Sequence, residues 1–442
     1  MLKSVFREFA RYTSLNVLGM LGLSCYILAD TFFVSKGLGA NGLAALNLAI
    51  PVYSFIHGSG LMVGIGGGAK YAVQKGRGDD AGACRAFANA FYVCAALSLL
   101  FVVIGVFFSE QITSLLGADA AVYDMTETYL KVILIFAPAF LMNNLILCFV
   151  RNDGSPQLAM TAMIAGSLSN IVLDWLFIFP CGMGIFGAVF ATGLAPVISL
   201  IILSVHFIKR KNGFMLKKIR PEARFILAVL SGGLPSLITE WSSGIVMIVF
   251  NSIMLGLEGN TGVAAYGVIA NLSLVVIAIY TGIAQGIQPL ISRGCGTGDF
   301  HGSRRVLKYA LIFMLAVSAV VYAGVFFGAS GIAGIFNSEG NELLMGLAIQ
   351  GLKLYFIACP FVGFNVVISM YFAASEHARP AHIISLLRGF IIIIPAAYLF
   401  SGVAGITGVW CAFPATEAIV ALLSMLFYVL IRKRTAREGL IS

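Results

Sequence analysis

Long, unbroken apolar segments are the feature that most limits how this chain can fold. Hydrophobic residues make up 60% of its 442 residues and charged residues only 11%. A soluble domain of this size could not bury so much apolar surface, whereas a membrane-spanning helix needs about 20 mainly apolar residues. The segments are continuous rather than alternating, which argues against a transmembrane β-barrel. We therefore predict an all-α polytopic membrane protein whose main solvent is the lipid bilayer.

Twelve such segments follow one another along the chain. They lie at about 15–35, 48–70, 87–108, 129–150, 158–180, 185–207, 228–255, 262–291, 306–328, 350–374, 381–401 and 407–431. The chain has 49 glycines, and small residues let membrane helices approach closely. Prolines inside the segments favour bends, because each removes a backbone donor; they are Pro138, Pro235, Pro289, Pro360, Pro395 and Pro414.

The lysines and arginines predict the orientation and the division of the chain. Residues 209–224 hold seven of the 28 basic residues, and only Lys36, Lys131 and Lys353 fall on the opposite side of the membrane. Cytoplasmic loops are rich in Lys and Arg, so we expect both termini in the cytoplasm. We expect an N-terminal six-helix lobe at 1–208, a basic linker at 209–227 and a C-terminal six-helix lobe at 228–442.

The enrichment of Lys and Arg in cytoplasmic loops accounts for the net charge of +9, so this charge does not indicate a nucleic-acid partner. The eight cysteines are scattered without a CxxC pair, so they indicate neither a disulfide framework nor a cysteine metal site. We expect no cofactor.

The two halves of the chain repeat each other. Residues 43–87 align with 263–307 without a gap at an offset of 220, which places Gly78, Asp79 and Gly82 on Gly298, Asp299 and Gly302. Further on, the matched pairs are Lys131 with Lys353, Pro138 with Pro360, Gly184 with Gly405, Gly187 with Gly408 and Ala191 with Ala412. Each half has six segments, so the repeats are parallel. In transporters built this way, substrate sites lie between the repeats, and rocking of the halves gives alternating access.

Four acidic residues lie inside the apolar segments: Asp30, Asp174, Glu240 and Glu417. A charge at the bilayer centre costs roughly 2.5–3.5 kcal/mol on insertion scales, so such residues usually face a cavity or a partner and mark a functional site. None of the four segments shows a Lys or Arg of its own that would obviously pair with its acid.

Asp30 and Asp174 are expected at similar depth in the outer half of the first lobe. Each lies about five or six residues before the outer end of its segment, at about 1.5 Å per residue. Asn170 and Tyr26 each precede an acid by one turn and share its helix face, and Thr192 offers a hydroxyl at comparable depth. The cluster suits a proton, because burial and a like charge favour a neutral carboxyl. It also suits Na⁺ held by Asp30, Asn170, Asp174 and Thr192. The alternative is a polar cluster that only fastens helices together.

Glu240 and Glu417 are open to two interpretations each. Glu240 follows the bend at Pro235 and either faces a substrate cleft or bonds a neighbouring serine. Glu417 follows Pro414 and either has a direct role or satisfies backbone groups freed by that proline. We place both, with Phe33, as candidate substrate-cleft residues.

Several motifs resemble the multidrug and toxic compound extrusion (MATE) family, in its DinF-like branch. They are ADTFFVSKGLGANGLAALNLAIP (29–51), GRGD (76–79), RNDGSPQLAM (151–160), SNIVLDWLFIF (169–179), GIFGAVFAT (184–192), GLPSLITE (233–240) and QGIQPLISRGCGTGD (285–299). The resemblance implies a MATE/MOP-type fold of two six-helix bundles around a cleft. It implies export of cationic or amphipathic compounds driven by H⁺ or Na⁺, with Asp30, Asp174, Tyr26, Asn170 and Thr192 as the coupling site. The first segment lacks the proline at which some members bend, and the tenth lacks the acid of another branch.

The expected function is therefore a secondary efflux antiporter, monomeric, in a bacterial or archaeal cytoplasmic (inner) membrane. One rival is a flippase for a lipid-linked precursor of the same superfamily, but diphosphate headgroups need a cationic cavity and the buried charges here are acidic. The other is a channel or structural protein, which does not need two repeated lobes with an asymmetric acid cluster. An enzyme is not expected, because the segments contain no nucleophile–base pair.

Overall fold

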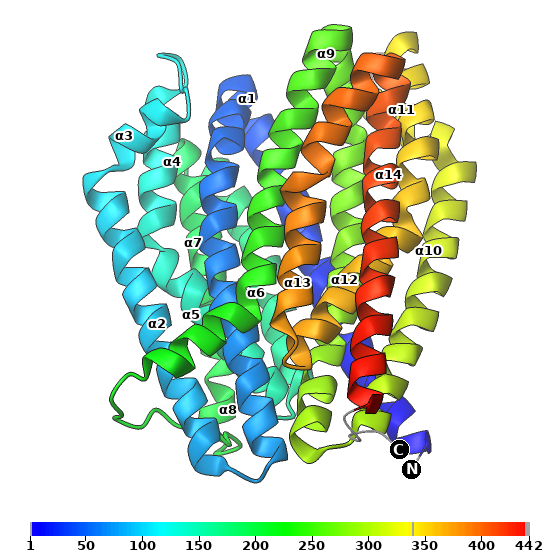
Figure 1. The fold of residues 1–442 in the computed structure, drawn as a ribbon. Helices are drawn as coiled ribbons and strands as arrows, with labels where there is room; N and C mark the ends of the chain where they lie inside the picture. The colour runs from blue at the N-terminus through cyan, green and yellow to red at the C-terminus, as the bar shows by residue number, and fades with distance from the viewer. Residues whose placement is uncertain (1, 338–339, 438–442) are drawn as a thin grey trace. The chain divides into compact units, whose positions relative to one another are not determined.

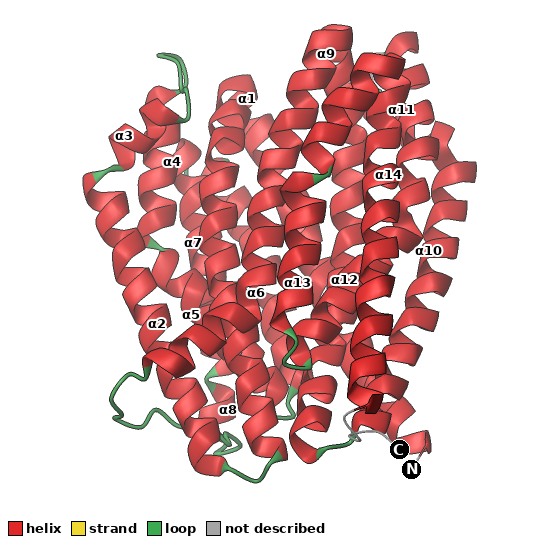
Figure 2. Ribbon diagram, in the orientation of Figure 1, coloured by secondary structure: helices red, strands yellow, loops and turns green. Residues whose placement is uncertain are grey.

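The computed structural model describes residues 2–337 and 340–437, and over these residues it contains helices and loops but no strand (Figure 2). The helices of the first half are α1 (Leu2–Gly76), α2 (Asp80–Phe107), α3 (Ser109–Leu115), α4 (Tyr123–Ile135), α5 (Ala137–Asn152), α6 (Pro156–Ile178), α7 (Gly184–Leu203) and α8 (Val205–Ile208). Those of the second half are α9 (Ala223–Thr297), α10 (Phe300–Phe336), α11 (Glu342–Tyr355), the 3₁₀ turn η1 (Phe356–Ala358), α12 (Cys359–Ala374), α13 (Ala378–Leu386), the π-helical turn η2 (Leu387–Ile391) and α14 (Ile393–Arg437).

Three of these helices contain a break that divides them into two spans. α1 and α9 have 75 residues each, or about 110 Å at 1.5 Å per residue, against a hydrocarbon core of about 30 Å. Their backbones turn at Gly39 and Gly259, and that of α14 turns at Gly405. Length and apolarity give up to nine candidate spans. Dividing the three helices at their glycines adds three, so the described residues contain the predicted twelve.

The internal repeat is visible in the backbone. Gly39 and Gly259 have φ of 67° and 59°, Gly78 and Gly298 have φ of 76° and 75°, and Gly184 and Gly405 have φ of 63° and 56°. Positive φ suits glycine because it has no Cβ. These pairs keep the offset of 220 or 221 residues found in the sequence.

The aspartates and prolines that match in the repeat have the same structural roles in both halves. Asp79 caps α2 by accepting from the Gly82 N–H at 2.7 Å, and Asp299 caps α10 by accepting from the Gly302 N–H at 2.8 Å. The helices that precede Pro138 and Pro360 end just before these prolines, and α4 and α5 meet at 45°. Matched residues therefore produce matched caps and matched helix ends.

The chain folds into two compact units. The N-terminal unit comprises Ser14–Trp241 and Ser292–Gly298, and the C-terminal unit comprises Met1–Thr13, Ser242–Ile291 and Asp299–Ser442. Within the N-terminal unit, α2, α4, α5, α6 and α7 run alongside one another, and within the C-terminal unit α10, α11, α12 and α14 do (Figure 1). The expected limits of 1–208, 209–227 and 228–442 follow the order of the chain and stay a prediction.

Glycines set the packing of α1 against the first part of α9 in the N-terminal unit. A Cβ on Gly66 would collide with the carbonyl oxygen of Val229, and one on Gly233 with that of Met62. Gly58 faces Leu237 and Glu240 in the same way, with room for a Cβ only 3.0 Å from that of Glu240. Small residues at such a contact let two backbones touch where lipid supplies no hydrophobic drive between helices. This contact brings Glu240 to α1.

The basic linker is anchored to the N-terminal unit by Phe214, which is fully buried. Its ring packs against Phe87 at 4.7 Å and Phe149 at 5.3 Å between centroids. Beside it, Asp153 accepts hydrogen bonds from the Gly213 N–H at 2.6 Å and the Tyr71 hydroxyl. One aromatic residue thus fixes a loop that the sequence marks mainly by its charge.

Candidate functional site

The N-terminal unit buries both acids of the predicted coupling site. Asp30 lies on α1 and is 7% exposed, and Asp174 lies on α6 and is fully buried. The two carboxylates are close enough for their charges to interact. Among the residues that the structure describes, neither has a Lys, Arg or His within ion-pair distance. Two carboxyl groups therefore share a buried place without a basic partner among the described residues.

Asn170 and Thr192 lie beside Asp174 at the contact of α6 with α7. With the Asn170 amide oriented to satisfy both of its groups, its nitrogen donates to Asp174 Oδ2 at 3.0 Å and its oxygen accepts from the Thr192 N–H at 3.2 Å. Gly166 on α6 faces the backbone of Ala195 on α7, which lets these helices approach closely. The predicted grouping of Asn170, Asp174 and Thr192 is thus present in space.

Tyr26 belongs to the same neighbourhood but bonds a residue that we did not predict. Its hydroxyl lies 2.7 Å from that of Tyr53, also on α1, and it is within electrostatic reach of Asp30. Tyr129 on α4 is 3% exposed and lies within reach of both acids and of Thr192. Sequence reasoning missed Tyr53 and Tyr129 because neither lies one helical turn from an acid in its own apolar segment. Their hydroxyls in the second and fourth apolar segments were the available signal.

One oxygen of each acid is left without a hydrogen-bond partner. Oδ1 of Asp30 and Oδ1 of Asp174 are both buried and unpartnered among the described residues. A buried polar atom without a partner is rare in proteins and needs an explanation. Uptake of a proton converts such an oxygen into a neutral donor, and a monovalent cation supplies it with a ligand bond. The arrangement can therefore hold either one.

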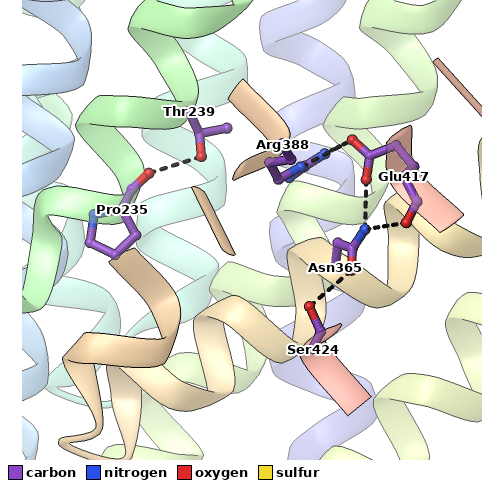
Figure 3. A network of polar contacts seen from close by, with 6 residues as sticks. All are labelled: Pro235, Thr239, Asn365, Arg388, Glu417 and Ser424. Carbon is purple, nitrogen blue, oxygen red and sulfur yellow. Dashed lines mark hydrogen bonds and ion pairs between the residues drawn. The ribbon is translucent and has the colours of Figure 1, made fainter. Parts of the chain in front are cut away.

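Glu240 lies on α9 in the N-terminal unit, opposite a histidine. Its Oε2 is 3.6 Å from His57 Nδ1, with the Glu240 side chain 34% exposed and that of His57 14% exposed. The neighbouring Thr239 donates its hydroxyl to the Pro235 carbonyl at 2.8 Å (Figure 3). Glu240 is the one predicted cleft acid with substantial exposure within the described residues.

Glu417 has a different environment, inside the C-terminal unit (Figure 3). It is 1% exposed, and its Oε1 accepts from Arg388 Nε at 3.1 Å and Nη2 at 2.9 Å. Its Oε2 accepts from Asn365 Nδ2 at 2.7 Å, and Ser424 donates to Asn365 at 3.2 Å. Arg388 lies in the π-helical turn η2. Sequence reasoning missed it, although a basic residue inside an apolar segment was an available signal. A role for Glu417 in a cleft stays a prediction.

Phe33, the remaining predicted cleft residue, is partly buried against the core of the N-terminal unit. Its ring meets Phe179 edge-on at 6.1 Å between centroids. The adjacent Phe32 is 60% exposed, so the two rings of the ADTFF motif face different surroundings. This contact gives Phe33 a packing role in the described structure, and its place in a cleft stays a prediction.

Comparison with known proteins adds to this geometry. The family model MatE matches residues 17–176 and 235–399, which is most of both halves. The multidrug export protein MepA of Staphylococcus saprophyticus is 26% identical over 433 residues, covering 98% of this chain and 95% of that protein. MepA of Staphylococcus aureus strain NCTC 8325 is 25% identical over 432 residues, covering 97% of this chain and 95% of that protein.

Two solved structures have the same fold. One, the outward-facing conformation of a multidrug resistance MATE family transporter of the MOP superfamily, is 26% identical with a TM-score of 0.89, covering 97% of this chain and 96% of that one. The other is a MOP superfamily transporter from Pyrococcus furiosus whose binding pocket of reverse polarity suggests a different function. It is 25% identical with a TM-score of 0.90 and the same coverage. These structures confirm the predicted fold class.

Proposed function

Because this chain belongs to the MatE family of multidrug and toxic compound extrusion transporters, we propose that it exports small organic compounds across the membrane by ion-coupled antiport. The proposed cargo is cationic or amphipathic, as multidrug export by the MepA relatives suggests. The coupling ion is H⁺ or Na⁺. The family consists of transporters rather than enzymes, which agrees with the expectation from the sequence.

The observation that carries the coupling proposal is the pair of buried, cation-free carboxylates on α1 and α6. Each acid has one oxygen without a partner among the described residues, and Asn170 holds Asp174 against Thr192. An ion that neutralises this pair removes the repulsion between the acids and changes how α1, α6 and α7 pack. Ion binding and helix packing are thereby linked.

The proposed cycle uses this link. In the outward-open state an ion occupies the site at Asp30 and Asp174, and the repacked helices disfavour the substrate, which leaves. The two halves then open inward, the ion escapes to the cytoplasm and a new substrate enters. The ion can shift this equilibrium only by the difference between its affinities for the two states.

The flippase alternative is not favoured. A diphosphate headgroup would need unpaired basic residues at its site. The buried arginine of the C-terminal unit described above, Arg388, is already neutralised by Glu417. Glu240 adds a negative charge on a partly exposed surface. These charges suit a cationic cargo better than an anionic one.

Gradient-driven efflux from proteoliposomes tests the proposal. Ethidium export is measured with a pH gradient alone and with a sodium gradient alone. Asp30→Asn and Asp174→Asn should each reduce it roughly tenfold or more, the effect of losing about 1.4 kcal/mol of differential ion binding. Asp299→Asn is the matched control, because asparagine also caps a helix and should leave export unchanged.

Unchanged export in both Asp30→Asn and Asp174→Asn would refute the coupling assignment. Export that responds to only one of the two gradients identifies the ion.

A further inference from the structure

A second ionisable pair lies in the N-terminal unit, apart from the two buried acids. His57 Nδ1 on α1 is 3.6 Å from Glu240 Oε2 on α9. Unlike Asp30 and Asp174, both side chains are partly exposed. Glu240 can therefore meet a cation that arrives from outside the protein core, while His57 stands within ion-pair distance of the same carboxylate.

The two residues meet because the backbones touch next to them. Gly58 follows His57 directly, and any Cβ there would press on Glu240 and Leu237. The His57 carbonyl also accepts from Asn144 Nδ2 on α5 at 3.4 Å. The backbone of His57 is thus held between α5 and α9, which limits how far the imidazole can withdraw from Glu240.

The groups around His57 can accommodate an imidazolium. Tyr53, one turn earlier on α1, stacks on the imidazole at 5.9 Å between centroids and 13° between planes, a geometry that also stabilises an imidazolium through cation–π attraction. From α9 it faces the carboxylate of Glu240, and α5 contributes the uncharged Asn144. Histidine is the side chain whose charge ordinarily changes between pH 5 and 8.

We propose that His57 is the proton-controlled competitor of the cationic cargo at Glu240, and this rests on the proposed export function. When His57 is neutral, Glu240 is the counter-ion of a lipophilic organic cation. When His57 is protonated, it pairs with Glu240, leaves no net charge for the cargo and releases it. Proton uptake by His57 thus replaces the ion pair between the cargo and Glu240 with one between His57 and Glu240. In this way His57 determines specificity for charged cargo.

Tyr53 joins this pair to the coupling acids. Its ring stacks on His57 and its hydroxyl lies 2.7 Å from that of Tyr26, which is one turn from Asp30. Tyr53 is within electrostatic reach of both Glu240 and Asp30. A change of charge at either place alters the field at this shared tyrosine. Tyr53 is therefore the positioning residue between the two.

The test is equilibrium binding of tetraphenylphosphonium to the full-length protein in detergent, without any gradient. This probe carries a permanent charge, so its own ionisation does not change with pH. The background is the Asp30→Asn, Asp174→Asn double variant, which removes the titration of the coupling acids. Its dissociation constant should rise roughly tenfold as the pH is lowered from about 8 to about 5, the range over which the charge of a histidine ordinarily changes. With His57→Gln added, the constant should change less than about twofold over the same range.

Two further variants make the result decisive. Glu240→Gln should bind the probe weakly throughout and lose the pH dependence, because the shared carboxylate is gone. His377→Gln, the same substitution at an exposed loop histidine, should keep the tenfold change. The inference is overturned if His57→Gln retains the full pH dependence, or if Glu240→Gln binds as tightly as its parent. Binding needs no gradient, so a failure of coupled export leaves this result standing, and the converse also holds.

Discussion

Replacing Arg388 by methionine should strongly destabilise the C-terminal unit. The substitution keeps the unbranched stem as far as the position of Nε but removes both N–H groups that bond Glu417 Oε1, at 3.1 and 2.9 Å. Glu417 is 1% exposed, so water cannot take the place of the guanidinium. The carboxylate would remain as a buried charge with Asn365 as its remaining bonded side chain among the described residues.

The size of the effect follows from this burial. Removing one partner of a buried ion pair typically costs about 3–5 kcal/mol, mostly because the other charge is left unpaired. Asn365 still donates to Oε2 at 2.7 Å, which places Arg388→Met near the lower end, at about 3 kcal/mol. Changing Arg388 and Glu417 together to methionine removes both charges, and such apolar replacements are often neutral, so the double variant should recover most of the loss.

Thermal unfolding in detergent measures these differences. At about 2–4 °C per kcal/mol for a unit of this size, Arg388→Met should lower the midpoint by about 6–12 °C. Arg305→Met on the exposed face of α10 is the matched control and should shift stability by less than about 0.5 kcal/mol.

Two results would refute this reasoning. An Arg388→Met midpoint within about 2 °C of the unmodified protein would mean that Glu417 is not an unpaired buried charge in the variant. If the double variant were less stable than both single variants, the Arg388–Glu417 pair would itself stabilise the unit. The two charges would then do more than compensate each other.

The remaining predictions concern backbone contacts and caps. Gly233→Ala should destabilise the N-terminal unit by about 1–3 kcal/mol, because the new Cβ would collide with the Met62 carbonyl. Its control is Gly267→Ala on the same helix, where no atom lies within 4 Å of the new Cβ, and this variant should be neutral or stabilising. Equal thermal unfolding midpoints for the two variants would count against the packing of α1 on α9. Asp79→Ala and Asp299→Ala should each cost about 1 kcal/mol, because each removes a helix N-cap; unfolding midpoints that fall for one variant alone would show that the repeated caps are not equivalent.

Much of the fold could be predicted from the sequence because its signals are local. A helix must be long and apolar to cross lipid, so the twelve segments are visible in composition alone. Gly39, Gly259 and Gly405 break helices through their own backbone freedom, and the aligned repeat marked the last of these positions. The sequence did not show that the helices continue up to these glycines on both sides, because glycine is a poor helix former and a glycine-rich stretch predicts a loop.

The burial of Asp30 and Asp174 was predictable for a related reason. A carboxylate within an apolar segment is unfavourable wherever it points, so Asp30 and Asp174 stand out before any partner is known. Asn170 was found by helix periodicity. Tyr53 and Tyr129 were not found, because a tyrosine in a membrane helix is ordinary and only its neighbours give it meaning.

The sequence by itself showed that lipid is the main solvent of this protein, and it showed the twelve spans and the internal repeat, because these are patterns of the chain itself. It also predicted that Asp30 and Asp174 are buried, because both lie inside long apolar segments. Only the tertiary structure decided which basic residue lies beside each of the acids Glu240 and Glu417. Glu240 and Glu417 look alike as acids that follow a proline in an apolar helix. One lies partly exposed against His57, and the other is buried against Arg388. Their partners are 183 and 29 residues away, and helix packing alone brings them together.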